Sequence, residues 1–183
     1  MRSLTEASNL KKFLTELGRA TQEPARIYLV GGASAVLLGW RQTTIDIDLE
    51  IVPDRDDLLL AIRTLKEKLQ INVELASPSH FIPALPGWQD RSVYIGQEGP
   101  LSIYHYDFYS QALAKIERGH EQDRLDVEEM LARGLVEPAR LRSLYTAISE
   151  QLYRYPAVDP RSFDRELERA LSDTGAGGVS PST

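Results

Sequence analysis

One short stretch of strictly alternating character, residues 45–51 (IDIDLEI), constrains the fold more than any other part of the sequence. Isoleucine or leucine occupies each odd-numbered position, and aspartate or glutamate occupies each even-numbered position. This alternation predicts a β-strand with one apolar face and one acidic face. Because burying a carboxylate is costly without a compensating charge, the acidic face must meet either water or a cation.

Composition restricts the class of protein around this strand. The 183 residues, 42% apolar and 26% charged, are typical of a globular protein with one compact domain and a helical appendage. No cysteine is present, which excludes disulfides and thiolate metal sites, and a cytoplasmic location is the expectation. The sequence has no signal-peptide core and no apolar run that would cross a membrane. The net charge of -6 argues against broad nonspecific binding of DNA.

The first half of the chain mixes helices and strands. Apolar spacing, glycine and proline predict helices over about residues 5–19, 34–38 and 54–69, and strands over 26–30, 45–51, 71–75, 93–95 and 101–106. Asp54 or Asp56 is expected to cap the third helix, and Gly39 to end the second. The histidines lack zinc-like spacing, and His105 is interpreted as structural.

From Asp107 onward the pattern is helical only. Asp107 is expected to cap a helix that stops at Gly119, and a second helix stops at Gly134. Pro138 and Pro160 suit the first turns of two further helices. The predicted organisation is an α+β core with an N-terminal helix over 1–106, a helical segment over 107–171 and a disordered tail over 172–183.

The pair Asp46 and Asp48 is the first candidate site. Two carboxylates on one face of one strand repel each other unless a cation neutralises both, and hard divalent cations such as Mg²⁺ or Mn²⁺ are the natural partners. If the next strand lies alongside, Glu74 approaches the pair. Three carboxylates that hold one or two metal ions suit in-line attack on a phosphorus atom.

The glycine pair Gly31-Gly32 is the second candidate site. A tight turn before a helix lets backbone N–H groups approach a phosphate, and Ser34 can add a hydroxyl. Each feature alone has a simpler interpretation, since most glycine pairs are turns and most strand carboxylates face water, as Glu50 on the same face suggests. Their order along the chain favours a metal-bridged phosphate ligand.

The combination Val30-Gly31-Gly32, a spacer of about a dozen residues and Asp46-Ile47-Asp48 resembles the signature of the nucleotidyltransferase superfamily with the DNA polymerase β fold. The resemblance implies an α+β fold, with a mixed-sheet core followed by a helical C-terminal segment. It also implies a third carboxylate from a later strand, where Glu74 stands in a place more often taken by aspartate.

The segments LVGGASAVLLG, TTIDIDLEI, FIPALPGW and HYDFYSQALAKIERGHEQDRLDVEEML extend the resemblance over most of residues 26–136. They resemble a small bacterial family related to abortive-infection and toxin–antitoxin transferases. In the related toxin transferases a motif Arg-x-Thr-x-Asp often precedes the strand; Thr44 fits it, whereas Arg41 is one place too early.

The same resemblance places a lysine and an aspartate near the nucleotide, which here are Lys115 and either Asp123 or Asp126. Without it, Lys115 is interpreted as an exposed cation. The two aspartates can equally pair with Lys115, Arg118 or Arg124 and hold two helices together.

The predicted activity is transfer of a nucleoside monophosphate from an NTP to an RNA such as tRNA, a protein or a small molecule, with Mg²⁺ or Mn²⁺ and within a toxin–antitoxin or defence system. The alternatives are a catalytically silent, antitoxin-like regulatory module with a cognate toxin or antitoxin as partner, and a domain whose carboxylates are merely solvated. The predicted catalytic residues are Asp46, Asp48, Glu74 and Lys115, the first three as metal ligands; the predicted nucleotide ligands are Gly31, Gly32, Ser34, Thr44, Lys115 and Asp126.

Overall fold

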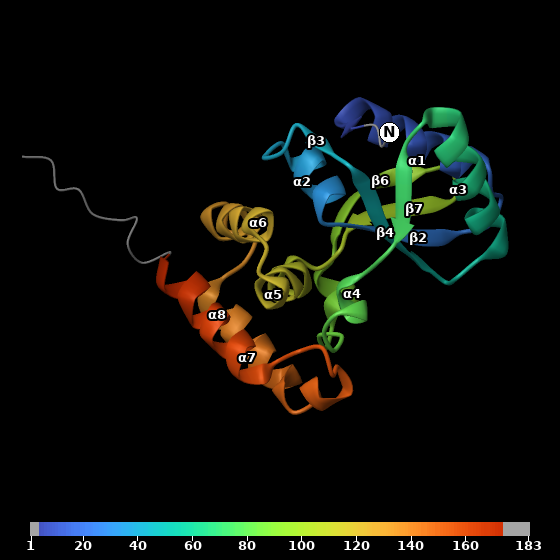
Figure 1. The fold of residues 1–183 in the computed structure, drawn as a ribbon. Coiled ribbons are helices and arrows are strands. Elements are labelled where there is room, and N and C mark those ends of the chain that lie inside the picture. Colours follow the sequence, from blue (N-terminus) through green and yellow to red (C-terminus); the bar gives the residue numbers. More distant parts are fainter. Residues whose placement is uncertain (1–3, 174–183) are drawn as a thin grey trace, which may run out of the picture. The chain divides into compact units, whose positions relative to one another are not determined.

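The computed structural model describes residues 4–173, which divide into two compact units (Figure 1). The first unit holds the chain up to Ser77 together with Gln89–Tyr106, and the second holds Pro78–Trp88 and the chain from Asp107. Pro78–Trp88, predicted as part of the core, belongs instead to the helical unit, where Tyr155 donates a hydrogen bond of 2.9 Å to the Ser79 carbonyl.

A five-stranded mixed sheet forms the centre of the first unit, in the order β5-β4-β2-β7-β6. Strand β4 runs antiparallel to β2 and parallel to β5, while β7 is parallel to β2 and antiparallel to β6. The predicted mixed sheet and the β6–β7 hairpin are confirmed. The strands are β2 (Ala25–Val30), β4 (Asp46–Val52), β5 (Asn72–Leu75), β6 (Val93–Glu98) and β7 (Leu101–His105).

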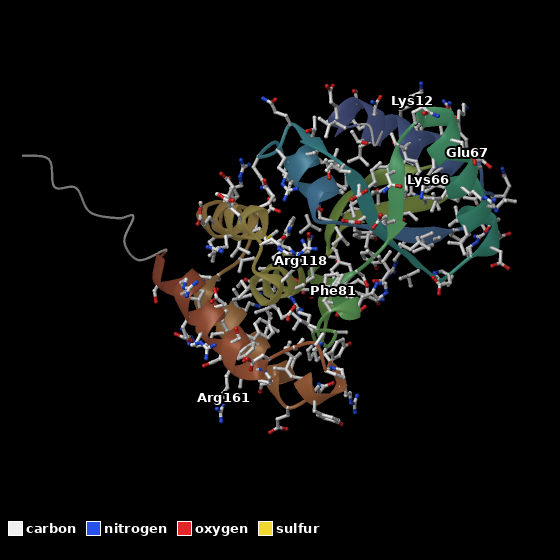
Figure 2. All side chains as sticks on the ribbon, in the orientation of Figure 1. Lys12, Lys66, Glu67, Phe81, Arg118 and Arg161 are labelled. Carbon is white, nitrogen blue, oxygen red and sulfur yellow. The ribbon has the colours of Figure 1, made fainter. Side chains whose placement is uncertain are left out.

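The apolar face of this sheet is covered by two helices that contact each other, α1 (Ala7–Arg19) and α3 (Asp56–Leu69) (Figure 1). Their apolar stripes form one core with the inward side chains of the strands. Lys66 of α3 donates to the carbonyl of Val73 in β5 at 3.0 Å, which ties the crossover helix to its strand (Figure 2). The helix thus brings β5 alongside β4, as expected for a parallel crossover.

Short elements complete the first unit: α2 (Gly32–Leu38) and a small ladder of β1 (Thr5–Glu6) with β3 (Thr43–Thr44). Gly39 ends α2 with φ +85°, as predicted.

The predicted cap of α3 is wrong. Arg55 occupies the N-cap position without a side-chain cap bond, because Asp56 is already helical and contributes through the helix dipole instead.

The second unit is helical, and its predicted starts are confirmed. Asp107 accepts hydrogen bonds from the N–H groups of Tyr109 and Ser110 and so caps the first helix. The last helix extends to Asp173, so residues 172 and 173 of the predicted disordered tail are helical, and 174–183 lie outside the described residues. The elements are η1 (Pro78–His80), α5 (Phe108–Arg118), α6 (Glu121–Ala132), α7 (Pro138–Ser149), η2 (Leu152–Arg154) and α8 (Pro160–Asp173), while α4 (Trp88–Arg91) lies at the division between the units.

Within residues 4–173, no helix combines the length and apolarity that a membrane span requires.

Candidate active site

The two faces of β4 differ as the sequence predicts. Ile47 and Leu49 are fully buried in the core, whereas Asp46, Asp48 and Glu50 are each half-buried on the opposite face. The alternation is therefore set by the core, which leaves the acidic residues on the face away from α1 and α3.

Strand register brings Glu74 beside this acidic face. In the parallel pair β4–β5, Asp48 is paired with Glu74, and Asp46 is paired with Asn72. Paired residues on neighbouring strands lie about 5 Å apart and point to the same face. The predicted approach of Glu74 to the aspartates is thus present in the backbone.

The side chains, however, are organised around an amide. Nδ2 of Asn72 donates to Oδ1 of Asp46 and, at 3.2 Å, to Oε1 of Glu74. Across the described part of the chain, no three His, Cys, Asp or Glu side chains are arranged to hold a metal ion. The oxygen donors have the chemistry that Mg²⁺ or Mn²⁺ prefers, and Asn72 bonds one oxygen of Asp46 and one of Glu74.

The glycine turn lies against the same acids. Val30 is paired with Asp48 across β2 and β4, and Gly31 follows with φ +57°. A Cβ atom at Gly31 would lie 3.6 Å from Oδ2 of Asp48. The turn and the Asp48 carboxylate are therefore neighbours, as a ligand that contacts both would need.

Gly32 is packed even more closely. A Cβ atom there would lie 2.1 Å from Oγ1 of Thr44 and 3.3 Å from Nη1 of Arg41. The Thr44 hydroxyl donates to the Asp46 carbonyl at 2.9 Å, so it links the turn to the start of β4. The Arg41 side chain therefore lies at the turn, although Arg41 is one residue earlier in the sequence than the Arg-x-Thr-x-Asp motif requires.

We expect Gly32→Ala to lower the free energy of unfolding by about 1–3 kcal/mol, because the new methyl group overlaps the Thr44 side chain. Gly96→Ala is the matched control: a Cβ at Gly96 meets no atom within 4 Å, and its effect should stay within about 0.5 kcal/mol. Urea unfolding measures both. Equal effects of the two substitutions would contradict the close packing at Gly32.

Ser34 stabilises the glycine turn through buried hydrogen bonds. Its side chain is fully buried, its hydroxyl donates to the Leu29 carbonyl at 3.1 Å, and Oγ lies 2.9 Å from Nδ1 of His105. A hydroxyl has one proton, so Nδ1 must donate to Oγ. This arrangement leaves no hydroxyl proton for the predicted phosphate contact, and Ser34 instead joins α2 to the sheet.

His105 is structural, as predicted. It is 6% exposed, and burial lowers the pKa of its imidazole to about 4. The ring is therefore neutral in the folded protein at pH 7.

This pKa makes stability depend on pH. Unfolded His105 binds a proton below about pH 6.5 but folded His105 only near pH 4, so acidification through this window favours unfolding by about 3 kcal/mol. We expect His105→Asn, which keeps a polar group near Ser34, to flatten the curve. The measurement is urea unfolding of both proteins from pH 7.5 to 4.5, and parallel curves would contradict the neutral buried ring.

Lys115 and Asp126 lie in the second unit, in a buried charge cluster. Nζ of Lys115 donates to Oδ2 of Asp126 at 2.6 Å and to Oδ1 of Asp123 at 3.1 Å. Arg118 donates twice to Asp123, at 2.7 and 2.6 Å. The exposed-cation interpretation of Lys115 is wrong, since the residue is 7% exposed. The contacts are those of the structural alternative, and nucleotide binding by Lys115 and Asp126 stays a prediction.

The electrostatics of this cluster favour the ionised form of the Asp123 carboxyl. Burial raises the pKa of the Asp123 carboxyl, but the hydrogen bonds and charges of Arg118 and Lys115 outweigh burial, so the net pKa is lowered. The four side chains therefore join α5 to α6 through paired charges.

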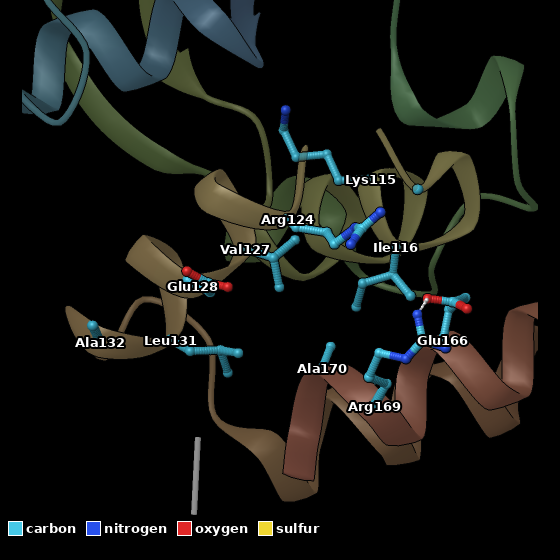
Figure 3. A pocket seen from close by; sticks show the side chains of 11 residues that line it. Lys115, Ile116, Arg124, Val127, Glu128, Leu131, Ala132, Glu166, Arg169 and Ala170 are labelled. Atoms are coloured by element: carbon cyan, nitrogen blue, oxygen red, sulfur yellow. Dashed lines mark hydrogen bonds and ion pairs between the residues drawn. The ribbon is translucent and has the colours of Figure 1, made fainter. Parts of the chain in front are cut away.

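A cavity of about 410 Å³ lies between α5, α6 and α8 of the second unit. Its walls include Ile116, Val127 and Leu131, and the pair Arg169–Glu166, with 3.0 Å between Nη1 and Oε2, lies at its edge. Figure 3 shows the ammonium end of Lys115 directed away from Arg169, so only the rest of Lys115 faces the cavity. Helical spacing alone did not predict this cavity, because it depends on how α8 packs.

A family model described as a nucleotidyltransferase of unknown function (DUF6036) matches residues 7–165. The chain belongs to this family. The match supports the nucleotidyltransferase superfamily, and the mixed α+β architecture is consistent with that fold. Comparisons with curated proteins and with solved structures found no match. The narrower resemblance to abortive-infection and toxin–antitoxin transferases stays a prediction.

Proposed function

We propose that this member of the family is a metal-dependent enzyme that transfers a nucleoside monophosphate from an NTP to an acceptor hydroxyl. The proposal depends on the position of Asp48, where three segments meet. Asp48 is paired with Glu74 on β5 and lies against the Gly31 turn. A carboxylate in contact with a side-chain-free turn suits a ligand that is both phosphorylated and metal-bound.

In this proposal Asp46, Asp48 and Glu74 hold Mg²⁺ or Mn²⁺. The bound cation supplies positive charge for the attacking and leaving oxygens of an in-line displacement. Gly31 leaves room for the triphosphate beside Asp48, because it carries no side chain. Gly32 is proposed to contribute through its backbone, since Thr44 fills the place that a side chain there would take.

In the proposed reaction the acceptor oxygen is the nucleophile. The acceptor oxygen bonds to the α-phosphorus, and the bond from that phosphorus to the bridging oxygen of the leaving pyrophosphate breaks. Glu74, an exposed carboxylate at the end of β5, is proposed to help activate the acceptor hydroxyl, either as a metal ligand or as the base that takes the hydroxyl proton. The acceptor class is an RNA such as tRNA, a protein or a small molecule, and a toxin–antitoxin context is part of the proposal.

A second candidate is a catalytically silent regulatory module that acts through protein contacts. One observation favours it: Asp46 and Glu74 are held by Asn72, and the described residues contain no three-ligand cluster for a metal. A catalytically silent module would retain the fold without binding the metal ion.

To distinguish the enzyme from the silent module, the protein is incubated with each NTP labelled at the α-phosphate, with Mg²⁺ or Mn²⁺, and with total tRNA or a candidate partner protein. The enzyme is expected to transfer label from an α-labelled NTP and none from a γ-labelled NTP. Calorimetry with Mn²⁺ and NTP runs in parallel. Binding of neither ligand would contradict the enzyme and support the silent module.

A further inference from the structure

The cavity between α5, α6 and α8 belongs to the second unit, whereas the acidic face and the glycine turn belong to the first. Its volume of about 410 Å³ lies within the range of about 300–1,000 Å³ that is typical of small-molecule sites. An apolar cavity of about 150 Å³ is already large enough to hold a benzene molecule. Because protein interiors are close-packed, a space of this size between helices is not an ordinary packing defect.

The lining of the cavity is mainly apolar. Its walls are formed by Ile116 of α5, Val127 and Leu131 of α6 and Ala170 of α8, together with the methylene part of Lys115. Ile116 and Val127 are buried, and Leu131 is half-buried. Contact with such walls removes the apolar surface of a ligand from water, so the lining favours a ligand with an apolar body.

Four charged side chains lie at the edge of the cavity, Arg124 and Glu128 on α6 and Glu166 and Arg169 on α8. Glu166 and Arg169 form an ion pair with each other, so their charges are already matched. Arg124 and Glu128 are exposed, which shows that the cavity is open to solvent along α6.

The Arg124 side chain is the charge available to a ligand. Within residues 4–173 it makes no ion pair or hydrogen bond. Figure 3 shows its guanidinium directed from α6 toward Ile116 of α5, whereas the Glu128 carboxylate stays beside α6. An unpaired guanidinium next to apolar walls is complementary to a molecule that is apolar over most of its surface and carries one anionic group.

We propose that this cavity binds a small organic anion. The apolar body of the ligand lies between Ile116, Val127 and Ala170, and its carboxylate, sulfonate or phosphate group accepts hydrogen bonds from Arg124. Burial of the apolar body supplies most of the affinity, and the charge-assisted bonds select an anion over a neutral molecule. This site does not depend on nucleotidyl transfer, since none of these contacts involves the acidic face.

The test uses two dyes that share an apolar ring system, the anion 8-anilinonaphthalene-1-sulfonate and the neutral N-phenyl-1-naphthylamine. Fluorescence titration of the full chain gives the affinity for each dye, and we expect the wild type to bind both. Arg124→Met should bind the anionic dye about tenfold more weakly, because the charged hydrogen-bond donor is lost. Its affinity for the neutral dye should change by less than about twofold, since that dye has no anionic group to lose its partner.

Arg161→Met is the matched control. Arg161 is an exposed arginine of α8 that does not line the cavity, and Figure 2 shows its side chain extending away from the helix. Its replacement removes the same charge from the same unit, so both affinities should stay within about twofold of wild type. Equal weakening of the anionic dye by Arg124→Met and Arg161→Met would contradict a local role of Arg124.

Ala170→Trp tests where the dyes bind. The indole ring would occupy the cavity, so both dyes should bind at least about tenfold more weakly. The thermal unfolding midpoint without dye shows whether this variant is folded; if it is not, the response of the two dyes to Arg124→Met decides the question.

Three results would overturn the proposal: no binding of either dye by the wild type, equal affinity of the wild type and Arg124→Met for the anionic dye, or unchanged binding by folded Ala170→Trp. A chain that ends at Asp173 provides a further arm. If it bound both dyes at least about tenfold more tightly than the full chain, residues 174–183 would be the natural occupant of the cavity, and the small-anion site would be wrong. Unchanged affinity of the shortened chain supports the proposal.

Discussion

Asp48→Asn is expected to reduce nucleotidyl transfer by at least about a thousandfold while changing the free energy of unfolding by no more than about 1 kcal/mol. Asparagine keeps the shape of the side chain but removes the negative charge beside Gly31 and Glu74. The measurement is the initial rate of label transfer at saturating NTP and Mn²⁺, with urea unfolding of the same preparation.

Glu50→Gln is the matched control for this prediction. Glu50 lies two residues further along β4 on the same face, where it is paired with Tyr28 in β2. It has no part in the proposed site, so its transfer rate should stay within about twofold of wild type. If Asp48→Asn kept a tenth of the activity, or if Glu50→Gln lost as much, the metal site would not be centred on Asp48.

The sequence predicted the two faces of β4 because burial of one face imposes a period. Ile47 and Leu49 are fully buried, and the acids between them are not, so a period of two marks the strand and its faces at once. Helix ends at Gly39, Asp107 and Pro138 were predicted because each depends on a local backbone requirement.

What the sequence did not show depends on pairings between distant segments. The contact of Asn72 with Asp46 follows from the register of β4 with β5, and that of Ser34 with His105 from the register of β2 with β7. The resemblance singled out Lys115 with Asp123 or Asp126, and the structure shows that both aspartates contact Lys115. Neither apolar spacing nor capping patterns encode which polar side chains will meet, so the candidate site was predicted by residue type and only the structure gives its contacts.

Lys115→Met is expected to lower the free energy of unfolding by about 3–5 kcal/mol, because it leaves Asp126 and Asp123 buried without their shared cation. Methionine preserves the length of the side chain, so the loss reports the charge and its hydrogen bonds. Urea unfolding of the full chain measures it. Lys12→Met, at an exposed position of α1, is the control and should change stability by no more than about 0.5 kcal/mol.

A double-mutant cycle with Asp126→Asn separates the pair from its surroundings. Asp123 keeps two hydrogen bonds from Arg118, so the double variant removes both charges of the Lys115–Asp126 pair and should cost less than the sum of the single changes. If Lys115→Met cost no more than Lys12→Met, the cluster would not hold α5 to α6. Loss of NTP binding by Lys115→Met without loss of stability would support the nucleotide-binding role that the family resemblance implies.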